Sequence, residues 1–290
     1  MVEYQLPTAD FYHLLYKYFP SELPWYMLYY LTTDTLVEPL LSKGYASGQV
    51  PYWHLADRCI WIGDFRDVDE LESLAVSSRG SWSWLGDAVD TILFAKETCL
   101  LHSVALSLPD SVHLVSRHFY TADYLADKGS LLLSSETKNF RIDSCNTSAY
   151  SLEDDMLFLI ASDSVDTFAY DFALTIFADF SILFYKRRYV GWMLQQASCY
   201  LISDAGPHQS YYETSTSKKS ALHRYFGYFN EEVANRMEEE DPVVKKELMV
   251  FLAELDQKYD PQFASIREGI ANLLDGYFGI EPVRPSEPVA

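Results

Sequence analysis

The sequence predicts an α+β protein: a mixed sheet with packed helices, followed by a C-terminal all-helical appendage. Three observations lead to this class. Residues 172–185 alternate apolar and polar side chains with the period of two that a β-strand gives. Beyond residue 220, helix-start residues such as Asn230 and Pro242 recur at the beginnings of candidate helices. A change of composition at Ser203 separates the two parts.

The first 44 residues are rich in aromatic side chains and predict two helices. Apolar residues between Phe11 and Tyr18 recur at intervals of three and four, as one buried helix face requires. A second helix is expected over about 25–41, although Pro39 should end or kink it.

The segment from residue 59 to residue 161 predicts short alternating elements. The apolar run Cys59–Ile62 is typical of a buried strand, and residues 67–74 form a short helix with acidic residues in its first turn. A long helix is expected over 87–106, with Asp87 and Asp90 at its start. Further strands are expected over 112–119, 131–133, 140–142 and 156–161, and a short helix over 121–127.

Residues 172–185 carry the clearest strand signal. The apolar side chains from Phe172 to Phe184 occupy even-numbered positions, whereas Thr175, Asp179 and Ser181 occupy odd ones. This alternation predicts a sheet with one face on the core and one less apolar face. The last strands of the sheet are expected over 189–194 and 199–202.

We expect four parts along the chain. Residues 1–203 form a mixed α/β domain, and residues 204–220 form a loop or linker rich in Ser and Thr. Residues 221–280 form a C-terminal helical region, and residues 281–290 a disordered tail. The C-terminal helices are expected over 220–229, 230–240, 242–259 and 261–278.

Composition indicates a folded protein that remains inside the cell. Apolar residues make up 49% of the chain, which is enough for a packed core. The four cysteines show no CxxC spacing, which favours reduced, buried thiols. The start of the chain lacks the pattern of a secretory signal, and the most apolar run, 172–185, is too short to span a bilayer. We therefore expect a cytoplasmic protein without membrane contact, located in the host cytoplasm if its source is viral.

The net charge of -20 comes from 42 acidic and 22 basic side chains. This surplus opposes direct binding to nucleic acid, because phosphate contacts depend on Lys and Arg. It favours a protein partner with a basic surface, or serves solubility alone. The charge is unevenly spread: residues 1–170 carry 24 acidic and 10 basic side chains (-14), residues 171–230 carry 4 and 6 (+2), and residues 231–290 carry 14 and 6 (-8).

Two charged segments are candidate binding sites. A row of carboxylates on the helix expected over 230–240 either imitates a nucleic-acid backbone towards a partner or is a solvated helix end. Its candidate partner-binding residues are Glu231, Glu232, Glu238, Glu239, Glu240 and Asp241. The basic triplet Lys186, Arg187 and Arg188 is a candidate for self-association with the acidic regions, which would give a homo-oligomer, or an exposed turn that happens to be basic.

No local motif supports catalysis. The sequence has no phosphate-loop, dinucleotide-fold, zincin or hydrolase-elbow pattern, so no catalytic residue, metal or cofactor is predicted. The pair His54 and Asp57, with Asp64, Asp67 and Asp69 downstream, allows a carboxylate-rich metal site, against the simpler interpretation of a turn before an acidic helix start. Cys145 with His113 or His118 makes a nucleophile–base pair of the kind that any chain with several Cys and His offers, and a buried structural cysteine is the simpler interpretation.

The best interpretation is a non-catalytic binding protein whose acidic surface steers it to a basic or nucleic-acid-processing partner. An inhibitor, a toxin-immunity protein or a phage anti-defence protein would have this character, because complementary charge accelerates encounter. Two alternatives stay open. One is an adaptor or chaperone that holds a client protein with its terminal helices. The other is an enzyme with an unrecognised carboxylate and histidine site around His54.

Overall fold

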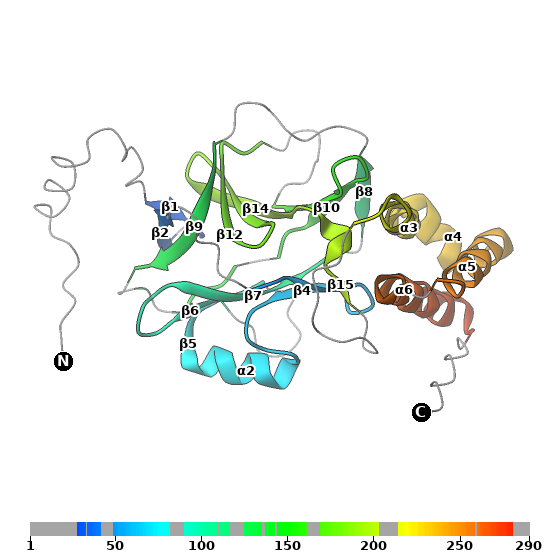
Figure 1. Cartoon of the computed structure of the whole chain (residues 1–290), viewed down its shortest axis with the longest axis horizontal. Helices are drawn as coiled ribbons and strands as arrows, with labels where there is room; N and C mark the ends of the chain where they lie inside the picture. The colour runs from blue at the N-terminus through cyan, green and yellow to red at the C-terminus, as the bar shows by residue number, and fades with distance from the viewer. Residues whose placement is uncertain are drawn as a thin grey trace, which may run out of the picture.

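The computed structural model of the chain describes residues 28–32, 34–41, 49–81, 90–109, 111–115, 125–134, 137, 139–142, 144–161, 169–202, 214–258 and 260–280. Within these residues the strands form two sheets, and helices follow at the C-terminal end of the chain (Figure 1). This architecture confirms the α+β class and the helical C-terminal region expected from the sequence.

Among the described residues the larger sheet has nine strands, and part of it closes into a ring. Strand β1 (Tyr29–Tyr30) pairs with both β2 (Leu36–Leu41) and β14 (Arg188–Leu194). The strands from β1 to β14 in the sheet order therefore leave no open edge between them. The order is β1-β2-β9-β12-β13-β14-β11-β10-β8, in which the other strands are β9 (Leu125–Leu133), β12 (Phe172–Phe177), β13 (Phe180–Tyr185), β11 (Met156–Ile160), β10 (Thr147–Ser151) and β8 (Val112–Val115).

The smaller sheet has six strands and lies below the larger one in the view of Figure 1. Helix α2 (Val68–Ser77) runs across its outer face. The order is β15-β3-β4-β7-β6-β5, with β15 (Leu201–Ile202), β3 (Tyr52–His54), β4 (Cys59–Ile62), β7 (Leu101–Ser107), β6 (Thr91–Ala95) and β5 (Ser78–Ser81).

The C-terminal helices begin where the sequence places their capping residues. Asn230 accepts a hydrogen bond from the Val233 N–H over 2.9 Å at the start of α4. Asp241 and Asp260 cap the next two helices in the same way, each just before a proline at the first helical position. The helices are α3 (Thr216–Phe226), α4 (Glu231–Glu238), α5 (Pro242–Leu255) and α6 (Pro261–Phe278), and short 3-10 turns occupy Ala197–Cys199 and Gly227–Phe229.

One apolar core joins both sheets to the helices. Phe226 of α3 stacks on Trp53 of the smaller sheet with ring centroids 5.8 Å apart, and it also packs on Tyr150 of the larger sheet at 5.3 Å. Buried residues of both sheets and of α3, α5 and α6 belong to the same cluster. Among the described residues, no helix is both long enough and apolar enough to cross a membrane.

The helix expected over 25–41 is wrong where the chain is described. Residues 29–30 and 36–41 are strands, and burial alternates along Leu36–Leu40. Pro39 is accommodated because β1 covers only the first part of β2, where it pairs with Leu36 and Val37. Residues 36–41 form a strand because they pair with β9, including Leu131–Leu133, about 90 residues away in sequence. The first expected helix, around residues 11–18, lies outside the described residues.

The long helix expected over 87–106 is also wrong where the chain is described, because residues 91–107 form the hairpin β6–β7. Ile92, Leu93 and Phe94 are all buried, since both faces of β6 are covered. A continuous apolar run of this kind has no period that distinguishes helix from strand. The turn between the strands ends at Cys99, which has a left-handed φ of 59°.

Other strand predictions need smaller corrections. The odd-numbered face of residues 172–185 is buried as well, with Ser181 only 1% exposed, because Ala173 and Leu183 belong to a second apolar cluster. Residues 125–127 begin strand β9 instead of ending a helix. Phe140 makes only an isolated bridge to Ser81. The strands expected over 59–62, 131–133, 156–161 and 189–194 and the helix expected from residue 67 are confirmed.

Candidate partner-binding surface and groove

The acidic residues singled out in the sequence lie on and around α4. Glu231 and Glu232 occupy its first turn, where carboxylates complement the helix dipole. Glu238 lies in the last turn of α4, where the dipole disfavours negative charge, and Glu239 and Glu240 lie between α4 and the cap of α5. Glu240 has a left-handed φ of 54°. All five side chains are exposed and make no hydrogen bond or ion pair with the described residues.

Asp241 has a different role from the five glutamates. Its carboxylate accepts a hydrogen bond from the Val243 N–H over 2.7 Å, which caps α5, and pairs with Arg236 Nε over 2.8 Å. The Val243 N–H and then the Arg236 guanidinium lower the pKa of Asp241. Asp241 therefore joins α4 to α5, and the acidic surface proper consists of Glu231, Glu232, Glu238, Glu239 and Glu240.

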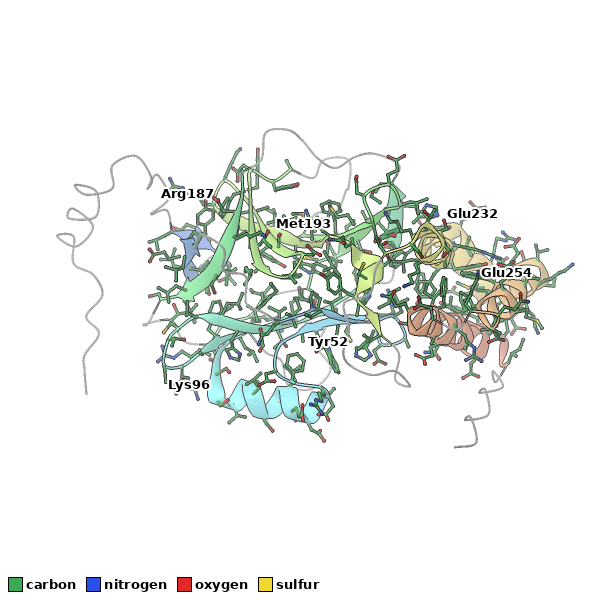
Figure 2. The ribbon with its side chains drawn as sticks, viewed as in Figure 1. Tyr52, Lys96, Arg187, Met193, Glu232 and Glu254 are labelled. Carbon is green, nitrogen blue, oxygen red and sulfur yellow. The ribbon has the colours of Figure 1, made fainter. Side chains whose placement is uncertain are left out.

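In the basic triplet, Lys186 and Arg187 form the exposed turn between β13 and β14, and Arg188 is the first residue of β14. Lys186 and Arg187 both have left-handed φ values, 48° and 67°, as a two-residue hairpin turn requires. The Tyr30 N–H donates to the Arg187 carbonyl over 2.8 Å, so the turn also helps to close the strand ring. Figure 2 shows Arg187 and Glu232 towards opposite ends of the molecule, so the basic turn and the acidic surface are far apart within one chain.

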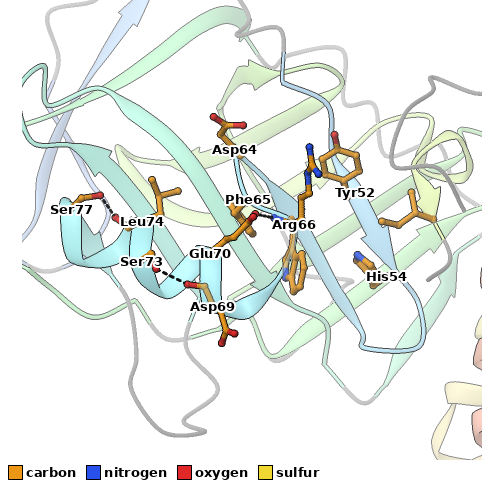
Figure 3. Close-up of a pocket in the computed structure, with 13 residues that line it drawn as sticks. Tyr52, His54, Asp64, Phe65, Arg66, Asp69, Glu70, Ser73, Leu74 and Ser77 are labelled. Carbon is orange, nitrogen blue, oxygen red and sulfur yellow. Dashed lines mark hydrogen bonds between the residues drawn. The ribbon is translucent and has the colours of Figure 1, made fainter. Parts of the chain in front are cut away.

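A groove of about 910 Å³ lies between α2 and the outer face of the smaller sheet (Figure 3). Alternation along the strands places Trp53, Ile60 and Ile62 on the core side, fully buried. The intervening side chains, Tyr52 and Trp61, therefore face outwards and lie opposite each other across the β3–β4 hairpin. The same alternation brings His54 to the groove.

An aromatic row forms the floor of the groove. The His54 ring lies 5.0 Å from the Trp61 ring, and Trp61 lies 5.6 Å from the Phe65 ring, with tilted planes. Phe65 is buried and fixes one end of the row. Rings at these separations have favourable edge and offset contacts, so the floor is held in one arrangement.

The loop from Gly63 to Asp67 sets the position of α2 above this floor. Gly63 has a φ of 157°, and a Cβ there would lie 2.5 Å from Ser103 Oγ, so the close approach requires glycine. Asp67 caps α2 by accepting from the Glu70 N–H over 2.8 Å. Glu70 in turn accepts from the Arg66 N–H over 2.7 Å, so the helix start is locked reciprocally.

The rim of the groove carries both signs of charge. Asp64, Asp69 and Glu70 contribute three carboxylates, and Arg66 contributes one guanidinium. Figure 3 shows the Arg66 side chain directed towards the Tyr52 ring, while Glu70 turns to the Arg66 backbone. Neither Asp64 nor Arg66 makes a side-chain hydrogen bond or ion pair with the described residues.

The carboxylate and histidine site considered from the sequence is only partly assembled. His54 and Asp64 share the groove, and Asp57 Oδ2 lies 3.8 Å from His54 Nδ1, a pairing that is ionic only when the imidazole is protonated. Asp67 is committed to the helix cap. Across the described parts of the chain, no three His, Cys, Asp or Glu side chains are grouped as metal ligands would be.

Cys145 does not have the properties of a nucleophile. It is buried, and its Sγ lies 3.5 Å from the Tyr189 hydroxyl. Burial raises the pKa of the Cys145 thiol to about 12, so the thiolate is scarce at neutral pH. His113, on β8, is exposed. His118 lies outside the described residues.

Sequence reasoning did not select Tyr52, Trp61 or Arg66, although a signal for two of them exists. Side chains alternate between the two faces of a strand, so when Trp53 and Ile60 are taken as core residues, Tyr52 and Trp61 fall on the other face of the same hairpin.

A comparison with protein-family models finds no match, and neither does a comparison with curated proteins.

Proposed function

We propose that the protein is a non-catalytic binding protein whose acidic surface docks on a basic surface of another protein. An inhibitor, a toxin-immunity protein or a phage anti-defence protein that blocks a nucleic-acid-processing partner would work in this way. The net charge of -20 supports the proposal, because complementary charge steers two proteins together and raises their association rate.

The observation that carries the proposal is the position of Glu238, Glu239 and Glu240 at the C-terminal end of α4. Glu238 lies in the last turn of α4, where the helix dipole disfavours a carboxylate, and Glu239 and Glu240 follow it directly, before the cap of α5. Arg236, the basic residue in the last turn of α4, pairs with Asp241 instead. Three adjacent carboxylates repel one another, and charges kept against such repulsion are typical of functional surfaces.

The test begins with capture of partners from native lysate by the full chain at low salt, followed by identification. The proposal expects a partner with a basic surface, whose association rate constant falls at least tenfold between about 0.02 M and about 0.5 M NaCl. Lysine substitution of Glu238, Glu239 and Glu240 should lower the same rate constant. The control replaces Asp34, Glu72 and Glu97, which are exposed, remote from α4 and outside the groove beside α2, with lysine.

Recovery of no basic partner at low salt would count against the proposal. So would a rate constant that the two triple-lysine variants lower equally, because the net charge, and not α4, would then govern encounter.

Self-association is a second part of the proposal. The basic turn and the acidic surface lie towards opposite ends of the chain, which is the arrangement that a head-to-tail contact needs. Light scattering at low and high salt tests it: a larger particle at low salt, lost on Arg187→Glu, supports self-association, and an unchanged monomer refutes it.

The adaptor or chaperone interpretation has one specific observation in its favour. Helix α5 exposes Val243, Met249 and Val250 by 46–53%, beside a shallow hollow of about 380 Å³. An exposed apolar helix face is suited to holding a client protein. Substitution of Met249 and Val250 with glutamate should abolish client binding under this alternative and leave charge-steered binding to a basic partner unchanged.

A further inference from the structure

We propose that the groove between α2 and the smaller sheet binds a cationic side chain, arginine or lysine, that a protein partner presents. This inference rests on the proposed function, because it assigns the contact site for a basic residue of the partner. The site is separate from the acidic surface on α4, since it is built from β3, β4, the loop of residues 63–66, the whole length of α2 and Ile202 of β15.

The aromatic floor is the first argument. The face of an aromatic ring carries negative charge density and attracts a cation within about 6 Å of its centre, most strongly when the ring is that of tryptophan. Tyr52 and Trp61 face outwards into the groove from neighbouring strands. Rings in this position offer a cationic side chain both an apolar surface for its methylene groups and an attractive face for its charge.

The net charge of the groove indicates that its ligand is positively charged. The groove has three carboxylates, on Asp64, Asp69 and Glu70, against the single guanidinium of Arg66. The balance is -2, which opposes an anionic ligand and attracts a cationic one. Asp64 has no hydrogen-bond partner among the described residues, so its oxygens are available to an incoming ammonium or guanidinium group.

The dimensions and rigidity of the groove fit a peptide segment. Its volume of about 910 Å³ lies in the range of ordinary ligand pockets and exceeds what one side chain fills. The reciprocal cap of Asp67 and Glu70 and the close approach at Gly63 hold α2 in place. A preformed site loses little conformational entropy when the ligand binds.

Arg66 is the cation that the groove already contains. Its side chain is directed towards Tyr52, where a cation from the partner would be placed (Figure 3). The partner's cation therefore competes with Arg66 or is repelled by it. Removal of the Arg66 charge should strengthen the binding of a cationic peptide, whereas removal of the acidic charges should weaken it.

The experiment titrates the full chain with an oligoarginine peptide, an oligolysine peptide of equal length, an oligoglutamate peptide and inorganic phosphate. The readout is the dissociation constant, together with the NMR resonance of the Trp61 indole N–H, which Trp61→Phe identifies. The variants are Asp64→Asn with Asp69→Asn, and Arg66→Gln alone. Glu238→Gln with Glu239→Gln removes the same charge on α4 and serves as the control. Thermal melting of each variant verifies that it is folded.

We expect the basic peptides to bind and to shift the Trp61 resonance. The double variant Asp64→Asn with Asp69→Asn should weaken oligoarginine binding about five- to tenfold, and Arg66→Gln should strengthen it about threefold. The control variant on α4 should change the dissociation constant less than twofold, because exposed charge contacts contribute modestly. Binding that both double variants weaken equally, with Trp61 unaffected, would refute the groove as the site and leave the acidic surface on α4 as the docking region.

Two further outcomes are decisive. Binding of phosphate or oligoglutamate that is lost on Arg66→Gln would overturn the cationic assignment. If the groove binds basic peptides but lysate capture yields no basic partner, the inference about the groove stands and the proposed function fails.

Discussion

The Tyr150 hydroxyl donates a hydrogen bond to Asp155 Oδ1 over 2.8 Å, and both side chains are at most 1% exposed. Asp155 also accepts from the backbone N–H and the hydroxyl of Ser198 and from the hydroxyl of Thr214. Ser198 in turn receives a hydrogen bond from Gln262 of α6 at its carbonyl. The buried carboxylate thus joins the larger sheet to the C-terminal helices.

Replacement of Asp155 with alanine should lower the free energy of unfolding by about 3–5 kcal/mol, because several buried donors lose their acceptor. Tyr150→Phe removes only one donor and should cost about 1–3 kcal/mol. Chemical denaturation measures both values, and a double-mutant cycle measures their coupling. If the two effects are simply additive, Tyr150 and Asp155 do not act together.

Asp90 should make stability fall as the pH rises. Burial raises the pKa of its carboxyl from 3.8 to about 7, against the hydrogen bond from the Ser107 N–H. Between these values the folded protein holds a proton that the unfolded chain has released, so the Asp90 contribution declines with increasing pH.

Replacement of Asp90 with asparagine removes this titration. The stability of the variant relative to the unmodified protein should therefore increase by about 2–3 kcal/mol between about pH 5 and about pH 8. Urea denaturation at several pH values gives the difference, and Glu97→Gln, in the exposed turn between β6 and β7, is the matched control. A difference that does not vary with pH would show that Asp90 is ionised throughout.

The four thiols should react unequally with iodoacetamide. Burial raises the pKa of Cys59 and Cys145 to about 12 and that of Cys199 to about 11. Cys99 lies partly exposed at the end of the β6–β7 turn. Near pH 8 in the native protein, peptide mass mapping should find Cys99 modified first, because attack requires a thiolate and access. Early modification of Cys145 would contradict its burial.

Phe226 should be essential for the attachment of the helices to the sheets. Phe226→Ala removes a ring that packs on both Trp53 and Tyr150 and should lower the free energy of unfolding by about 3–5 kcal/mol. Phe229→Ala, at a half-buried position three residues later, should cost less. Hydrogen exchange locates the effect: protection should fall in α3 and α6 before it falls in β12 and β13.

Local chemistry is sufficient to predict the elements that carry their own signals. Asn230 and the Asp-Pro pairs at 241–242 and 260–261 cap helices by contacts within a few residues, so those helix starts are readable from the chain. The strand character of residues 172–185 is readable from their alternation, which does not signal the turn that divides them into β12 and β13. The acidity of the α4 region is a matter of composition. The candidate acidic residues could therefore be named in advance.

Pairing between distant segments decided the rest. Residues 36–41 became a strand because β9 provides their partner, and residues 91–107 became a hairpin because β5 and β4 pair with its two outer edges. The burial of Asp90 and Asp155 and the meeting of Trp61, Asp64 and Arg66 beside α2 likewise depend on tertiary packing. By itself the sequence determined where the C-terminal helices are capped, which segment alternates as a strand does, and where the acidic charge lies. The tertiary structure alone decided strand pairing and the groove, because the interactions that set them join residues far apart in the chain.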